Sequence, residues 1–223
     1  MAKSNHPPAS VLKLPLGKRP RLTRAEKGEK TRQALFNAGV HVVGEVGYAN
    51  AMISAITSRA QTAQGTFYNY FESRQDLFDA LLPELGRELL DFIKEETKAS
   101  RNALEREERS FRTFFTFLKI RPEFYRILYE AELFAPLAFK RHIDAIAEGY
   151  MRMLTRGAKE GQLRTQNSQE IEAIAYMLMG TRDYLCMRFA RRDGKTISVP
   201  EWVVRAYMDL VSNSLFHPKS EVS

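Results

Sequence analysis

Residues 64–70 place several side chains that can hydrogen-bond nucleic acid on one short stretch of chain. Glutamine and asparagine can each form two hydrogen bonds with adenine, and threonine and tyrosine can contact phosphates or a thymine methyl group. Arg74 follows about one helical turn later, where a cation can reach the phosphate backbone. We therefore expect duplex DNA as the partner of this segment. The candidate side chains are Gln64, Thr66, Tyr68, Asn69 and Tyr70.

The surrounding residues predict the pair of helices that would carry these side chains. Residues 47–77 contain two short helical segments joined by a tight break at residues 61–63, with the small Ala60 where the helices would cross. This spacing fits a helix-turn-helix, whose second helix, near residues 64–70, enters the major groove. Two short polar helices are equally an ordinary part of many helical bundles, so the motif needs support from elsewhere in the chain.

The basic residues of the chain are concentrated at its N-terminus. The 223 residues carry a formal charge of +7, and residues 1–30 hold eight lysines and arginines against two glutamates. A basic segment attached to a nearly neutral body suggests a polyanionic partner. Residues 1–23 also contain four prolines, and we interpret them as a flexible basic arm. A solvated tail without a partner is the alternative.

The remainder of the chain predicts an all-α protein. The first helix starts at Arg24 and is ended by Gly44 and Gly47, and a later one spans residues 75–98 behind a cap formed by Ser73 and Asp76. Apolar residues then recur at helical spacing, without a convincing two-residue period. These segments cover residues 111–118, 122–129, 136–157, 168–185 and 200–215.

Residues 26–82 resemble the N-terminal DNA-binding domain of the TetR family of bacterial regulators. The most specific part is the run Gly-Thr-Phe-Tyr-x-Tyr-Phe-x-Ser-Arg over residues 65–74. The resemblance implies an all-α fold, with a three-helix DNA-binding domain over residues 24–82 and a helical bundle for effector binding and dimerisation over residues 83–223. Other matching residues are Arg32, Ala34, Leu35, Phe36, Gly47, Tyr48, Ile53, Ile56, Ala60 and Leu77.

The resemblance also implies roles for individual residues. Phe67 and Phe71 would pack the small domain, while Tyr68 and Arg74 would hold phosphates. Bases would be approached by Gln64, Thr66, Asn69 and Ser54. The chain departs from the family pattern at Gln61, where glycine is common, and at Ala63, where serine or threonine is common. An alanine cap forfeits about 1 kcal/mol, so Asn50 and Thr62 are alternative caps for the two short helices.

The central region is rich in aromatic residues and methionines, which fill a core or line a deformable pocket. The resemblance favours a pocket for a small apolar or aromatic effector, with one acidic group as an option because arginines recur in this region. Arg182 and Asp183 interrupt an apolar run; pairing with each other, facing solvent and orienting a ligand are the alternatives. The candidate pocket residues are Phe92, Phe115, Tyr125, Tyr129, Tyr150, Met179, Arg182 and Asp183.

The remaining motifs argue against an enzyme. The single cysteine, Cys186, excludes an intrachain disulfide, and no histidine stands at metal-ligand spacing. Glu105, Glu107 and Glu108 alternate with arginines and are expected on a solvated helix face, and His142 is expected at the surface. We predict no catalytic residue, cofactor or metal, and the absence of a long apolar run predicts a cytoplasmic protein without a membrane partner.

These observations together predict a repressor that binds palindromic operator DNA as a homodimer through its last two long helices and is released by a small-molecule effector. Two alternatives remain. The chain could bind DNA under the control of a protein partner or of no effector, or it could be a helical enzyme or carrier in which the two short helices only pack.

Overall fold

The structure is a computed structural model that describes residues 23–192 and 195–217. The predicted basic arm falls outside these residues except for Thr23. The described residues form an all-α fold with one small hairpin, which confirms the predicted fold class. The elements are α1 (Arg24–Asn50), α2 (Ile53–Arg59), α3 (Gln64–Phe67), α4 (Arg74–Thr97), α5 (Ala103–Ile120), α6 (Glu123–Phe134), α7 (Pro136–Lys159), α8 (Ser168–Phe189), β1 (Arg191–Arg192), β2 (Lys195–Thr196) and α9 (Glu201–Leu215).

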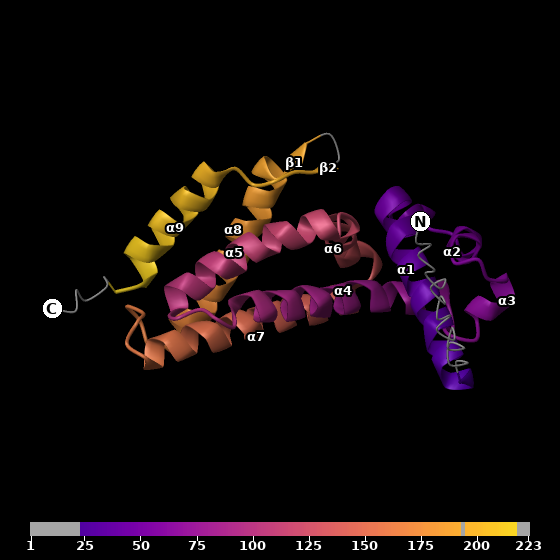
Figure 1. Ribbon diagram of the computed structural model, residues 1–223, viewed down its shortest axis with the longest axis horizontal. Coiled ribbons are helices and arrows are strands. Elements are labelled where there is room, and N and C mark those ends of the chain that lie inside the picture. The colour runs from indigo at the N-terminus through magenta and orange to yellow at the C-terminus, as the bar shows by residue number, and fades with distance from the viewer. Residues whose placement is uncertain (1–22, 193–194, 218–223) are drawn as a thin grey trace, which may run out of the picture.

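The helices form a small unit and a larger body that share α4 (Figure 1). Helices α1, α2 and α3 lie together at one end, and α4 leads from them along the body, beside α5 and α7. Helix α9 lies at the end of the body away from α1–α3, and α8 crosses the body from α7 toward the β1–β2 hairpin. One continuous set of buried apolar residues runs from Leu35 in α1 to Phe216 after α9. The division expected at residues 82 and 83 therefore falls inside α4, within a shared core.

Helix α1 is defined by a cap at its start and a glycine near its end. The Thr23 hydroxyl accepts a hydrogen bond from the Glu26 amide, and the Glu26 carboxylate accepts one from the Thr23 amide, which completes a capping box. Gly47 leaves helical geometry with φ 80° and ψ 166°, as expected for a break. The prediction that Gly44 could end the helix is wrong, because the helix continues through it.

The two short helices of the expected motif are present, and their caps differ from both alternatives. Helices α2 and α3 begin after Met52 and Ala63, neither of which supplies a side-chain cap. The Asn50 amide instead donates to the Val46 carbonyl. The Thr62 hydroxyl is buried and has no partner in the described part of the chain. Helix α3 is also shorter than expected, because residues 68–70 form a turn after Phe67.

The antiparallel hairpin of β1 and β2 was not predicted. It pairs Arg191 with Thr196 and Arg192 with Lys195, directly after α8 ends. Strands of two residues are too short to show the alternation from which a strand is predicted.

Among the described residues, no helix is both long and apolar enough to cross a membrane.

The turn between α2 and α3 depends on a left-handed residue. Gln61 has φ 54°, a conformation that glycine adopts without strain. Its amide donates to the Ser58 carbonyl at 3.1 Å, and the Thr62 amide donates to the Thr57 carbonyl at 3.0 Å. These two bonds form a Schellman motif, which closes α2 and turns the chain into α3. The turn therefore keeps its geometry although Gln61 stands where the resembling family commonly has glycine.

Substitutions at Gln61 test this turn. A β-branched side chain is poorly tolerated at positive φ, so Gln61→Val should lower the free energy of unfolding by about 1–3 kcal/mol. Gln61→Gly should leave it unchanged or raise it by up to about 1 kcal/mol. Ser58→Val, at an exposed helical position, is the control. Equal effects of the two valine substitutions in urea denaturation would show that Gln61 carries no backbone strain.

Candidate DNA-binding surface and effector cavity

The residues expected to contact DNA lie around α2, α3 and the start of α4. The side chains of Ser54, Gln64, Tyr68, Asn69 and Arg74 are exposed, whereas Thr66 and Tyr70 are half-buried. The Gln64 and Asn69 amides form no side-chain hydrogen bond with the described part of the chain. They are therefore free to pair with an external partner. The half-buried Tyr70 packs against α1, with its hydroxyl near Gly28.

The exposed face is supported by a buried aromatic layer. Phe67 and Phe71 are buried with ring centroids 5.5 Å apart, in the position that the sequence implies. Tyr48 is fully buried and meets Phe78 of α4 edge-to-face at 4.8 Å. The Arg74 guanidinium lies 5.3 Å from the Phe78 ring centroid, which holds this cation at the start of α4. The short α3 therefore has a rigid base despite its missing cap.

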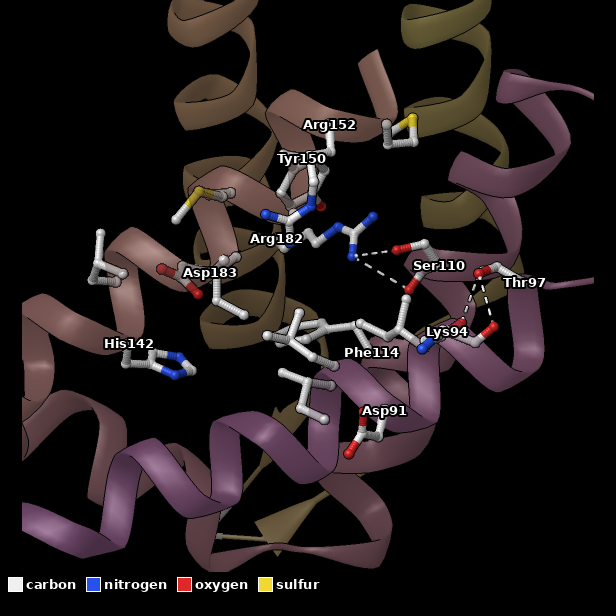
Figure 2. Close-up of a pocket in the computed structure, with 18 of the residues that line it drawn as sticks. Asp91, Lys94, Thr97, Ser110, Phe114, His142, Tyr150, Arg152, Arg182 and Asp183 are labelled. Carbon is white, nitrogen blue, oxygen red and sulfur yellow. Dashed lines mark hydrogen bonds between the residues drawn. The ribbon is translucent and has the colours of Figure 1, made fainter. Parts of the chain in front are cut away.

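A cavity of about 460 Å³ lies in the body, between α4, α5, α6, α7 and α8 (Figure 2). This volume is within the range of small-molecule sites. Most of the lining residues are apolar. Within residues 23–192 and 195–217, no group of three or more His, Cys, Asp or Glu side chains is placed to hold a metal ion. The principal apolar lining residues are Leu89, Ile93, Phe114, Phe124, Leu128, Ile146, Met153 and Met179.

The structure brings together only part of the expected pocket set. Tyr150, Met179, Arg182 and Asp183 line the cavity. Burial raises the pKa of Asp183 to about 6, while the nearby Arg182 opposes this shift. The Cys186 thiol is buried one turn later on α8, and burial raises its pKa to about 12.

The other four expected pocket residues lie outside the cavity lining. Phe115 is buried in the core against Phe111 and Phe114, and the half-buried Phe92 packs against this core at Phe117. The rings of Tyr125 and Tyr129 are tilted by 37° with centroids 4.3 Å apart, and Tyr125 lies under the Arg191 guanidinium at 3.8 Å. Helical spacing of aromatic residues did not distinguish these positions from the cavity wall.

Arg182 belongs to a buried ion pair that joins three helices. Its guanidinium donates to Glu107 Oε1 at 2.7 Å and to the Ser110 hydroxyl at 3.2 Å, both on α5. The Tyr207 hydroxyl of α9 donates to the same Glu107 oxygen at 2.6 Å. Glu107 is fully buried, so the expectation that it faces solvent is wrong. Glu105 and Glu108 do pair with arginines along the outer side of α5.

Three polar atoms around this ion pair have no partner in the described part of the chain. They are Glu107 Oε2, Arg182 Nε and the Tyr150 hydroxyl. Burial raises the pKa of Tyr150, which keeps its hydroxyl protonated as a donor. The Arg182 guanidinium lies 5.0 Å from the Tyr150 ring centroid. A buried unpaired polar group costs about 1–3 kcal/mol, so this end of the cavity favours an additional hydrogen-bonding group.

The same end of the cavity carries further positive charge. Lys94, Arg106 and Arg152 line it from the halves of α4, α5 and α7 that lie farthest from α1–α3 (Figure 1). Arg152 pairs with Glu148 at 3.3 Å. Lys94 and Arg106 form no ion pair within the described residues, so an anion bound there would meet uncompensated cations.

His142 lies at the opposite end of the cavity (Figure 2). It is buried against Gly86 and Phe124, so the expectation of a surface histidine is wrong. Burial lowers its pKa to about 4, and the ring is therefore neutral near pH 7. This end of the cavity combines a neutral ring with the apolar side chains of α6.

Substitutions in the buried ion pair test its contribution. Glu107→Ala leaves Arg182 buried without its carboxylate, which should cost about 3–5 kcal/mol of stability. The double variant Glu107→Leu with Arg182→Met removes both charges and should cost less than Glu107→Ala. Glu108→Ala, at the next residue but in a surface pair, should cost less than about 1 kcal/mol. Urea denaturation at one protein concentration measures all three, and equal losses for Glu107→Ala and Glu108→Ala would contradict the assignment.

Comparisons with known proteins agree with this arrangement. Residues 35–81 match the model of the bacterial regulatory proteins of the tetR family. The fatty acid metabolism regulator protein of Bacillus subtilis is 25% identical over 166 residues, covering 72% of this chain and 84% of the relative. The crystal structure of FadR from Bacillus subtilis in complex with stearoyl-CoA is similar, with a TM-score of 0.68, 20% identity and coverage of 80% of this chain and 96% of that chain.

A second solved structure, the fatty acid degradation regulator FadR from Bacillus halodurans, has a TM-score of 0.66 and 22% identity, and covers 81% of this chain and 94% of that chain. The match of the DNA-binding segment to the family model and the likeness of the whole helical arrangement point to the same group of proteins. Residues 35–81 therefore match the DNA-binding segment of the bacterial regulatory proteins of the tetR family, and the chain as a whole shares its helical fold with the two FadR structures.

Proposed function

We propose that this protein is a transcriptional repressor that binds palindromic operator DNA as a homodimer and releases it when a small molecule occupies the cavity. The observation that carries the proposal is the combination of two features in one chain. An exposed set of hydrogen-bonding side chains surrounds α3, and α4 connects this unit with an apolar cavity that has a cationic end. The proposal assigns no catalytic role, cofactor or metal to the chain, and it places the protein in the cytoplasm with the chromosome.

In this proposal residues 24–82 act as the DNA-binding domain and residues 83–223 as the effector-binding and dimerisation domain. Gln64, Asn69, Thr66 and Ser54 approach bases, because they lie on or beside α3. Tyr68, Tyr70 and Arg74 hold the phosphate backbone. The basic arm over residues 1–23 would add attraction to the same polyanion.

Exposed apolar side chains on α8 and α9 support the dimer. Several apolar residues of these helices, such as Leu178 and Val204, are buried within the chain and are not available to a partner. Others remain exposed, and large apolar side chains that the chain itself leaves uncovered favour contact with a second copy. They are Tyr176, Met177, Tyr184, Met187, Trp202 and Leu210. Two-fold symmetry then requires operator half-sites about 34–36 Å apart, or a multiple of this distance.

The cavity favours an effector with an apolar body and an anionic group. The anionic group would lie near Lys94 and Arg106, and a carbonyl or hydroxyl beside it could use the unpaired donors of Arg182 and Tyr150. The apolar body would extend toward Phe124 and Leu128 of α6. Stearoyl-CoA, which is bound in the Bacillus subtilis FadR structure, belongs to this chemical class.

The DNA contacts are tested by comparing substitutions on and after α3. Gln64→Ala and Asn69→Ala should each cost about 1–3 kcal/mol of binding at one base position and relax selectivity there. Arg74→Ala should weaken binding to all DNA sequences by the same factor and reduce the slope of log affinity against log salt concentration by about 1. Binding to a duplex selected from a random pool measures both effects. Unchanged selectivity in the Gln64 and Asn69 variants would show that another face reads the bases.

The effector site is tested with amphipathic anions in an operator-release assay. Among stearoyl-CoA, stearate and the uncharged stearyl alcohol, we expect release by at least one anion and none by the alcohol. Lys94→Gln and Arg106→Gln should each raise the concentration needed for release about tenfold, or about 1.4 kcal/mol. Lys98→Gln, one turn beyond Lys94 on the exposed end of α4, is the control. Release that is unaffected by both cavity substitutions would place the effector elsewhere.

A further inference from the structure

The apolar end of the cavity is closed by the ring of His142, which α7 carries. This ring is buried and lines the cavity at the end away from Lys94 and Arg106 (Figure 2). Because burial lowers its pKa to about 4, the ring is neutral near pH 7. It can therefore border an alkyl chain without holding a charge away from water.

The ring is held in place by two neighbouring helices. On the side of α4 it lies directly against Gly86, where a built Cβ would be 2.3 Å from His142 Nδ1 and 2.8 Å from Cε1. On the side of α6 it meets the Phe124 ring edge-to-face, with centroids 5.7 Å apart. A glycine at position 86 is thus what allows the ring to occupy this place, and the ring has little room to swing aside.

A second hollow of about 400 Å³ lies on the other side of this ring, between α4 and α7. The hollow and the cavity have two lining residues in common, His142 from α7 and Leu90 from α4. Arg87 and Arg141 at the rim of the hollow are exposed, so it opens at the surface. Two side chains therefore separate the cavity from this hollow. The apolar part of its lining comprises Ala80, Pro83, Gly86, Leu90 and Ala145.

This partition has a direct consequence for an elongated ligand. An anionic group near Lys94 and Arg106 would direct the attached apolar chain toward His142. Each methylene that becomes buried along this path should raise affinity about fourfold. A chain that is longer than the path must bend, withdraw its anionic group from the cations or displace a packed ring, and each of these costs affinity.

We propose that His142, seated on Gly86 and flanked by Leu90, sets the maximum length of the apolar chain that the cavity accepts. This inference rests on the proposed function, since it takes the effector to be an amphipathic anion. It assigns discrimination of chain length to the partition between the cavity and the hollow, and recognition of the charge to the opposite end. Removing the partition should let a longer chain continue into the hollow.

Two substitutions open the partition from different helices. His142→Ala removes the ring from the α7 side. Leu90→Ala opens the same partition from the α4 side, at a half-buried position where a smaller loss of stability is expected. His142→Leu is the matched control, because it keeps a side chain of similar size in the partition and removes only the ring nitrogens.

The readout is equilibrium binding of straight-chain carboxylates of increasing length to the full-length protein, measured by calorimetry without DNA. For the unaltered protein, affinity should rise about fourfold per methylene up to a limiting length and fall beyond it. A chain two carbons beyond that limit should bind the two alanine variants at least about tenfold more tightly than the unaltered protein. Chains well below the limit should bind all the proteins within about twofold, and His142→Leu should keep the original limit.

Other results would overturn the inference. The partition does not set chain length if the unaltered protein shows no limit, or if the alanine variants keep the original one. A limit that lengthens equally in His142→Leu would show that the bulk of the side chain is not the barrier. If no carboxylate binds the unaltered protein, the proposed effector class fails and the inference fails with it. Thermal melting checks folding, and Leu90→Ala carries the test if His142→Ala does not fold.

Discussion

The position of the DNA-binding unit depends on the contact between the end of α1 and the helices of the body. Helices α2 and α3 are too short to hold themselves in place, since neither has a side-chain cap and α3 is a single turn. Their support comes from α1 and α4, through Tyr48, Phe78 and Leu77, and from α6 through its polar bonds to the α1 backbone. The unit is therefore continuous with the body. A change in the body can reach the DNA-binding surface without unfolding either part.

The body is organised around a different kind of constraint, which is a buried pair of charges. Glu107 and Arg182 tie α5 to α8, and Tyr207 adds α9 to the same carboxylate oxygen. Removing this ion pair from water costs free energy, and the atoms that lack a hydrogen-bond partner leave part of this desolvation cost without compensation. The ion pair lies at the cationic end of the cavity. An effector group that satisfied Arg182 Nε or Tyr150 would stabilise the occupied body, and this stabilisation is what can compete with operator binding.

Much of the DNA-binding unit could be predicted from the sequence, because its turn, its buried aromatic residues and its polar face fall within one short segment. The helical body was harder to predict from the sequence, because neighbouring charged residues on an amphipathic helix can lie on different faces. Glu107 was grouped with Glu105 and Glu108, yet its spacing of four and seven residues places it in line with Phe111 and Phe114. That alignment was visible in the sequence and would have placed Glu107 in the core.

The cavity itself could not be located from spacing. His142 follows the exposed Arg141, but a rotation of about 100° per residue turns it inward, toward Gly86. Phe92 and Phe115 have the same helical periodicity as the true lining residues, yet they pack against other phenylalanines of α5. The contact between α1 and α6 joins segments about eighty residues apart, and a single sequence carries no signal for such a pairing. Gly44 was read as a helix end, although its role is to admit α6, since a Cβ built there would lie 2.4 Å from Glu123 Cγ.

In the proposed dimer the two copies of α3 are held at a fixed distance by the joined helical bodies. The most direct measurement is the affinity of the protein for a series of duplexes in which one to five base pairs are inserted between the two selected half-sites. A five-base-pair insertion, which turns the half-sites to opposite faces of the DNA, should reduce affinity to that of a single half-site. An affinity independent of the spacing would contradict it.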